Sequence, residues 1–131
     1  MREEQNQALS DVTRAVMGLL DSWDLDTREI QAVLCLPENL RARALNKYRE
    51  GTDVLPDDPV VLRRARYLLR IADALRTTYP RNPRMSGRWV RQGHRRFGRR
   101  SPLSMILRDG ESGLIAVLSE LATHPSTGGV C

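Results

Sequence analysis

The side chains of this chain with the clearest capacity for chemistry are four arginines, Arg95, Arg96, Arg99 and Arg100, which flank Phe97 in a glycine-containing segment. A guanidinium group binds carboxylates and phosphates through parallel hydrogen bonds. We interpret these arginines either as a solvated basic face or as a docking surface for an acidic partner or nucleic acid. Phe97 either plugs the segment into the core or serves as an anchor at a protein interface.

Positive charge is concentrated in the middle of the chain. The formal net charge is +5, yet residues 59–108 hold 14 basic residues and one acidic residue. Residues 1–58 hold seven basic and 12 acidic residues, so the amino-terminal part is net acidic. A basic block of this size attracts anionic partners, although a solvated face explains the same pattern.

No catalytic constellation is visible in the sequence. His94 and His124 have no acidic or thiol partner nearby, and no phosphate-binding or dinucleotide-binding motif occurs. Cys35 and Cys131 have neither a metal-ligand spacing nor a disulfide framework. We therefore expect no enzymatic activity, no metal and no cofactor. We expect Cys35 to be a small core residue and Cys131 to be a free exposed thiol.

Length and composition indicate a small protein without a membrane segment. The chain has 131 residues, of which 40% are hydrophobic, enough for a modest core without disulfides. No apolar run approaches the ~20 residues that a membrane span requires. Residues 1–10 are acidic and amidic, unlike a secretory signal. We expect a soluble, cytoplasmic protein, and the spacing of its apolar residues predicts an all-α fold.

Three helices are predicted in the amino-terminal part. The first covers residues 8–23, and its apolar positions follow helical spacing. Asp26 begins the second, because Asp26 and Glu29 have the spacing of a reciprocal capping box. Pro37 ends that helix and also suits the first turn of a third helix, which ends at Gly51. The apolar positions of the first helix are Leu9, Val12, Val16, Leu19 and Leu20.

Two short helices behind a longer one are the layout of a helix-turn-helix, so residues 1–57 are interpreted as a helix-turn-helix-like module. On the third helix Leu40, Ala44 and Tyr48 share one side. On the other side, Asn39, Ala42, Arg43 and Asn46 could face bases, while Arg41, Lys47 and Arg49 at its edges would suit phosphates. Alternatively these are simply solvated residues. Glu38, Glu50 and the acidic balance of this module oppose DNA binding.

Residues 58–80 are predicted to form a long connecting helix. Asp58 supplies an N-cap carboxylate, and Pro59 suits the first turn. Three arginines on the opposite side from the apolar stripe, Arg63, Arg66 and Arg70, are expected to face solvent or another subunit. The expected core stripe consists of Val61, Ala65, Leu68, Ala72 and Leu75.

Residues 81–123 are predicted to form a small helical module. Its helices are expected at 86–92, 101–108 and 111–123, with a turn at 93–100 between the first two. Ser101 followed by Pro102 begins one helix, and Gly110 ends it with positive φ. Trp89 is interpreted as a core anchor rather than a binding platform. The expected core residues are Leu103, Ile106, Leu107, Leu114, Val117, Leu118 and Leu121.

The order of these features resembles the C-terminal domain of the Xre/MbcA/ParS antitoxin family. That domain has a tryptophan-led helix, a Pro-Asn pair, a Gly-Gly-x-Ser-Pro-Leu segment and a hydrophobic helix that ends in glycine. This chain has Gly93-His94 in place of Pro-Asn, and Arg99 in place of the second glycine. The resemblance extends over about residues 25 to 122. The matching residues are Trp89, Val90, Gly98, Ser101, Pro102, Leu103, Leu107 and Gly110.

The resemblance implies that residues 81–123 bind a toxin, typically a RES-domain enzyme that degrades NAD. It also implies that the flexible tail, residues 124–131, occludes the toxin's active site, and that the antitoxin represses its own operon as a homodimer or a larger assembly with the toxin. Operator DNA is therefore a second expected partner. The residues implied in toxin binding are Trp89, Arg95, Arg96, Phe97, Gly98, Arg99, Arg100, Ser101, Pro102, His124, Pro125, Ser126 and Thr127.

Two other functions fit the same sequence. One is a stand-alone helix-turn-helix transcriptional regulator, in which the C-terminal module serves only for dimerisation. The other is an adaptor that docks on a different enzyme through the arginine-rich turn.

Overall fold

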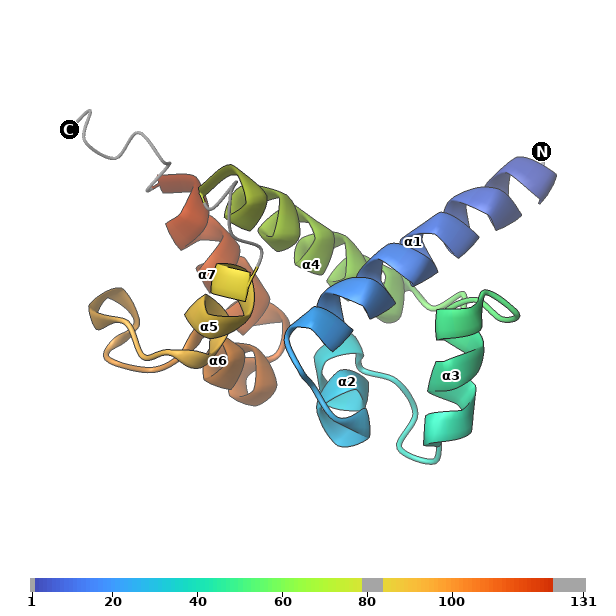
Figure 1. Cartoon of the computed structure of the whole chain (residues 1–131), viewed down its shortest axis with the longest axis horizontal. Helices are drawn as coiled ribbons and strands as arrows, with labels where there is room; N and C mark the ends of the chain where they lie inside the picture. The colour runs from blue at the N-terminus through green and yellow to red at the C-terminus, as the bar shows by residue number, and fades with distance from the viewer. Residues whose placement is uncertain (1, 79–83, 124–131) are drawn as a thin grey trace. The chain divides into compact units, whose positions relative to one another are not determined.

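The structure is a computed structural model that describes residues 2–78 and 84–123. All regular secondary structure in these residues is helical, which confirms the expected fold class. The elements are α1 (Arg2–Ser22), α2 (Thr27–Leu34), α3 (Ala42–Glu50), α4 (Pro59–Thr78), α5 (Arg84–Arg91), the short 3₁₀ helix η1 (Arg95–Phe97), α6 (Pro102–Asp109) and α7 (Glu111–Thr123) (Figure 1).

The chain divides into two units, and the division falls within α4. The N-terminal unit is Met1–Arg66 and the C-terminal unit is Tyr67–Cys131. No described helix is both long and apolar enough to cross a membrane.

The N-terminal unit is built around the packing of α3 on α1. Apolar side chains recur on one face of each helix at the spacing of an α-helix, so each helix buries a stripe. In α1 the buried stripe is narrower than expected, because Leu9, Val12 and Leu19 are only half-buried. The largest fully buried side chains of this unit are Met17, Leu20, Trp23, Ile30, Leu34, Leu45 and Leu55.

One buried hydroxyl ties the segment after α3 to α1. Thr13 is 1% exposed, and its hydroxyl donates to the carbonyl of Leu9 at 2.7 Å. The same oxygen accepts the backbone N–H of Leu55 at 3.1 Å. Both hydrogen-bonding roles of the hydroxyl are filled inside the core, so the burial of this polar group is compensated.

α2 begins as predicted. Asp26 accepts the backbone N–H of Glu29 at 2.8 Å, and the Glu29 carboxylate accepts the N–H of Asp26 at 3.0 Å. The helix ends at Leu34, because Cys35 takes a left-handed conformation with φ 60°. Cys35 is exposed, so the expectation that it is a core residue is wrong. The left-handed C-cap takes residue 35 out of the helix, so Cys35 does not continue the buried face of α2 formed by Ile30, Val33 and Leu34.

α3 begins later than predicted. Pro37 lies in a turn in which its carbonyl accepts the N–H of Leu40, and α3 starts only at Ala42 after the N-cap residue Arg41. The carbonyl of Leu40 is bound by the side-chain amide of Gln31 from α2. The expected helix start at Pro37 is therefore wrong, because these contacts stabilise a non-helical connection. The C-cap at Gly51, with φ 81°, is confirmed.

α4 carries the predicted cap and stripe. The carboxylate of Asp58 accepts the backbone N–H of Val60 at 2.8 Å. The five expected stripe residues are all buried, while Arg63, Arg66 and Arg70 are exposed. The helical period thus identified both faces of this helix correctly.

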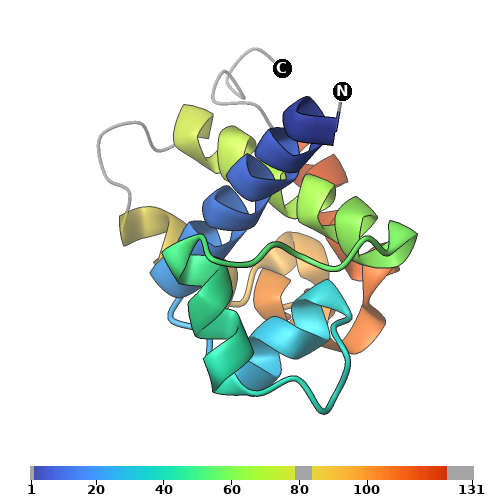
Figure 2. The same ribbon diagram turned by 90° about the vertical axis from the view of Figure 1, so that its right-hand side faces the viewer.

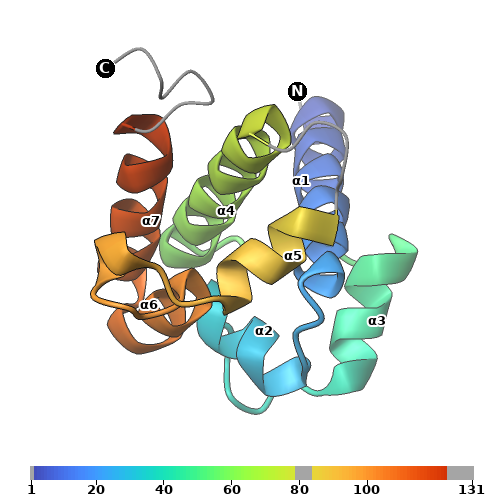
Figure 3. The same cartoon turned by 60° about the vertical axis from the view of Figure 1, so that its left-hand side comes forward.

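The C-terminal unit is organised by α6 and α7, which pack side by side (Figures 1 and 3). A Cβ atom on Gly113 would lie 2.2 Å from the carbonyl oxygen of Met105, so the two backbones approach closely because residue 113 has no side chain. The predicted N-cap is confirmed, since Ser101 accepts the N–H of Ser104 at 3.0 Å. Gly110 has the predicted positive φ, 64°.

The core of this unit follows the prediction with two exceptions. Leu107 and Leu118 are half-buried, whereas the other five expected residues are buried. Met105 of α6 and Val90 of α5 join them in the core.

Candidate functional site

The arginine-rich turn lies between α5 and α6 of the C-terminal unit, and its backbone is closed by its own hydrogen bonds (Figure 3). The carbonyl of His94 accepts the N–H groups of both Phe97 and Arg99 at 2.9 Å. The N–H of His94 donates to the carbonyl of Arg100 at 3.1 Å. These backbone hydrogen bonds connect the two ends of the turn. They constrain the backbone that carries the four arginines.

Two consecutive residues of the turn are left-handed. Gly98 has φ 62° and Arg99 has φ 68°. A left-handed conformation costs a residue with a Cβ atom about 1 kcal/mol, a cost that glycine avoids. Arg99 therefore presents a guanidinium group from a backbone conformation that suits glycine.

Three aromatic rings pack together beneath the turn. The ring centroids of Trp89 and His94 are 5.0 Å apart, and Phe97 meets both rings edge-on at 6.3 and 6.2 Å. The Nε2 atom of His94 lies 2.9 Å from the carbonyl oxygen of Trp89. Trp89 and Phe97 are only half-buried, whereas their neighbour Val90 is fully buried. The expectation that Trp89 is a core anchor is thus met only in part, and the half-burial of Phe97 fits both of its alternative roles.

A surface hollow of about 230 Å³ opens beside these rings. Residues far apart in sequence meet there, because α4 and α7 each contribute side chains to the same wall. The sequence did not predict that Thr78, Glu120 and Leu121 line the hollow, since no local pattern connects them with the turn. The lining residues are Thr78, Trp89, His94, Arg95, Arg96, Phe97, Glu120 and Leu121.

The four arginines of the turn differ in their partners. Arg96 pairs with Glu120 at 3.3 Å, and Arg100 pairs with Asp109 at 3.1 Å. The side chains of Arg95 and Arg99 are exposed and have no carboxylate partner among the described residues. As far as the described residues go, these two guanidinium groups are therefore available to carboxylates of a partner.

Other residues predicted at this site have structural roles. Ser101 caps α6, and Pro102 is buried at its first position. Gly98 permits the left-handed turn. His124, Pro125, Ser126 and Thr127 lie outside the described residues.

The predicted DNA-facing residues lie around the start of α3, and all five are exposed. Arg41, Arg43 and Lys47 line one shallow hollow together with Ala42 and Ala44. Asn39 belongs to the connection before α3 rather than to the helix, because α3 starts at Ala42.

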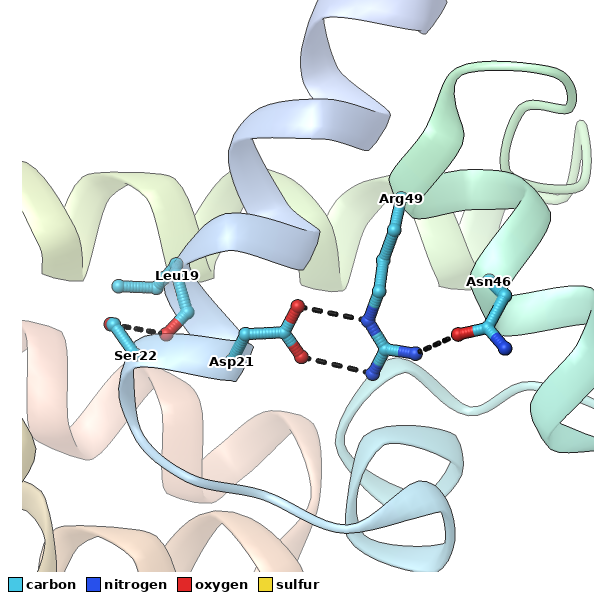
Figure 4. Close-up of polar contacts among 5 residues, drawn as sticks. All are labelled: Leu19, Asp21, Ser22, Asn46 and Arg49. Atoms are coloured by element: carbon cyan, nitrogen blue, oxygen red, sulfur yellow. Dashed lines mark hydrogen bonds and ion pairs between the residues drawn. The ribbon is translucent and has the colours of Figure 1, made fainter.

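Arg49 does not match its predicted role at the edge of that surface. Its guanidinium binds both carboxylate oxygens of Asp21 at 2.9 Å, and it also donates to the side-chain oxygen of Asn46 at 2.8 Å (Figure 4). The hydrogen bond to Asp21 raises the pKa of Arg49 above its ordinary value. The bidentate pair joins α3 to the end of α1, so Arg49 is held within the unit and Asn46 is partly engaged as well.

The connection between α2 and α3 covers residues 35–41 and forms a wide loop (Figure 2). A DNA-binding helix-turn-helix has a turn of about 3–4 residues. The connection in this chain is longer, and the helix-turn-helix arrangement stays a prediction.

Comparisons of the chain with protein-family models, with curated proteins and with solved structures found no match. The described residues contain no group of three or more His, Cys, Asp or Glu side chains placed to hold a metal ion. The fold and the site define an all-helical protein with a hydrogen-bonded, arginine-rich turn beside an aromatic cluster.

Proposed function

We propose that this chain is the antitoxin of a toxin-antitoxin pair, and that its C-terminal unit binds and neutralises a RES-domain toxin that degrades NAD. The observation that carries the proposal is the turn itself. Its backbone is closed by hydrogen bonds around His94, and it carries two exposed arginines, Arg95 and Arg99, of which Arg95 lines a hollow together with the half-buried Trp89 and Phe97. The residue pattern shared with the Xre/MbcA/ParS family supplies the identity of the partner.

The arrangement has the physical properties of a protein-binding surface. Arginine and aromatic residues dominate binding energy at interfaces because they combine a large contact area with hydrogen bonding. The basic block also accelerates encounter with an acidic partner through long-range attraction. In this proposal the turn docks the toxin and residues 124–131 occlude its active site. The same assembly represses its own operon.

The test is co-expression with the product of the adjacent gene, with growth, cellular NAD and co-purification as measurements. The full chain is expected to form a complex and to restore growth and NAD. A chain truncated after Ala122 is expected to bind the toxin yet to neutralise it less well. Undiminished neutralisation by the truncated chain would reject occlusion by the tail, and absence of both binding and rescue would reject the antitoxin function.

A second candidate function is a stand-alone transcriptional regulator, supported by the exposed basic group at the start of α3, Arg41, Arg43 and Lys47. It requires sequence-specific binding to DNA whose affinity falls steeply with salt. Replacing Arg43 and Lys47 with glutamine would then abolish promoter binding, whereas the same change at the exposed Arg63 and Arg66 would not. Promoter binding without any toxin partner would favour this function.

A further inference from the structure

We propose that the hollow beside the turn is a docking point for an acidic segment of a partner protein, with one apolar side chain of that segment in the hollow and its carboxylates on Arg95 and Arg99. The hollow and its arginines specify the chemistry that the partner presents. Only the identity of that partner depends on the proposed function.

The size and lining of the hollow favour a single side chain. At about 230 Å³ it is smaller than the pockets of about 300–1,000 Å³ that bind small molecules. Trp89, Phe97 and Leu121 give it apolar walls, and the two rings are half-buried. An apolar side chain that entered would cover this remaining surface, and such burial is favourable at about 25 cal/mol per Å².

The charges around the hollow select an acidic segment. Residues 84–108 contain eight arginines and no acidic residue. Within the turn, Arg96 and Arg100 are compensated by Glu120 and Asp109, while Arg95 and Arg99 have no such partner in the described part of the chain. A carboxylate next to the apolar anchor would pair with Arg95, which lines the hollow, and another carboxylate of the same segment would pair with Arg99 elsewhere on the turn. Glu120 lines the hollow and already pairs with Arg96, so its negative charge repels further carboxylates from that part of the wall.

The ring geometry favours a protein over a nucleic acid. Binding of single-stranded nucleic acid uses aromatic rings as platforms on which bases stack. Here Trp89 already packs against His94 at 5.0 Å and against Phe97 at 6.3 Å. His94 is also held by the carbonyl of Trp89. Part of each ring surface is therefore covered by the other two rings. A side chain fits beside this cluster better than a base stacks onto it.

The test measures fluorescence anisotropy of labelled peptides with the full chain. The probe is a fluorescein-labelled peptide of alternating Glu and Leu. One matched peptide has Gln in place of Glu, and another has Ser in place of Leu. The Glu-Leu peptide is expected to bind most tightly. The double variant Arg95→Gln/Arg99→Gln is expected to weaken that binding by about tenfold or more, the scale of losing charge pairs from which the docked peptide excludes water.

The matched control removes two charges elsewhere in the same unit. Arg70 and Arg108 are both exposed, so Arg70→Gln/Arg108→Gln has the same net charge as the test variant. It is expected to change affinity by less than about twofold, since exposed charges are screened by salt. Helical circular dichroism of both variants establishes that they fold.

Three outcomes would overturn the inference. Equal losses in the two double variants would mean that only net charge matters, and equal binding of the Glu-Ser peptide would mean that no apolar side chain enters the hollow. Tighter binding of labelled oligothymidylate, lost in Arg95→Gln/Arg99→Gln, would assign the site to nucleic acid. If the full chain still captures its toxin in these cases, the proposed function stands without the inference. If the peptide binds as expected and no toxin is captured, only the proposed function fails.

Discussion

A Cβ atom on Gly93 would lie 2.3 Å from the carbonyl oxygen of Arg99, closer than real Cβ atoms come to other heavy atoms. The contact joins the two ends of the arginine-rich turn. Gly93 is therefore required by the close approach of another backbone segment, and the position of Arg99 depends on it.

Gly93→Ala is expected to destabilise the C-terminal unit by about 2 kcal/mol, because the backbone at Arg99 must shift to admit the methyl group. Urea unfolding followed by circular dichroism measures the change. Gln92→Ala, at an exposed neighbour, is the control and is expected to have little effect. An unchanged midpoint for Gly93→Ala would show that the turn does not close as described.

Two glycines within helices are expected to respond to alanine with opposite signs. At Gly113 the added Cβ would meet the backbone of Met105 and Ile106, so we expect a loss of about 2 kcal/mol. At Gly18 nothing lies within 4 Å of the added atom, and alanine should stabilise α1 by about 1 kcal/mol through its helix propensity. Thermal unfolding of the two variants checks the signs. A Gly113→Ala variant without loss would contradict the close approach of α7 to α6, and a loss for Gly18→Ala would contradict the open space around that position.

Thr13→Val is expected to lower the free energy of unfolding by about 1–3 kcal/mol, although valine and threonine have nearly the same shape. The buried N–H of Leu55 would lose its acceptor, and an unpaired buried donor is costly. Thr13→Ser keeps the hydroxyl and is expected to cost less. Denaturant unfolding ranks the two variants, and the reverse order would mean that the methyl group of Thr13 matters more than its hydroxyl.

The ion pair of Asp21 and Arg49 is expected to contribute modestly to the stability of the N-terminal unit. Its side chains are 42% and 32% exposed, so solvent screens the attraction, and a double-mutant cycle with Asp21→Ala and Arg49→Ala should give a coupling of about 0.5–1 kcal/mol. Asn46→Ala, which removes only the second contact of Arg49, is the control. A coupling indistinguishable from zero would show that the bidentate geometry does not hold α3 on α1.

Tyr48 makes the N-terminal unit sensitive to alkaline pH. Burial raises the pKa of Tyr48 above its ordinary value of 10.0, and the charge of Asp53 raises it further. The folded state thus favours the protonated phenol, whose contribution to stability is complete below pH about 10 and is lost as the pH rises through the raised pKa. In Tyr48→Phe the unfolding free energy should therefore fall less steeply above that pH, which urea unfolding at a series of pH values measures; an equally steep fall would show that Tyr48 is not its source.

Local chemistry explains why many helix boundaries were predictable. The capping box of Asp26 and Glu29 and the caps at Ser101 and Asp58 depend on residues within a few positions of one another. Amphipathic periodicity likewise identified the buried stripe of α4 without knowledge of what covers it. The start of α3 was not predictable in this way, because its delay depends on the side chain of Gln31 binding the carbonyl of Leu40.

The candidate site likewise combines features that the sequence revealed with features that only the folded unit shows. The arginines, Phe97 and Trp89 were visible as a group in the sequence. Which arginines are compensated was not, because Arg96 meets its partner Glu120 on α7 only when the C-terminal unit folds.

The sequence by itself determined the helical class, most helix ends and the basic turn, since these follow from propensity, capping and charge along a short stretch of chain. Only the tertiary structure decided that Arg49 is bound to Asp21, that Cys35 is exposed, and that Arg95 and Arg99 remain without an acidic partner among the described residues. The physical reason is that side-chain pairing and burial depend on which helix faces meet. Residues distant in sequence determine that meeting.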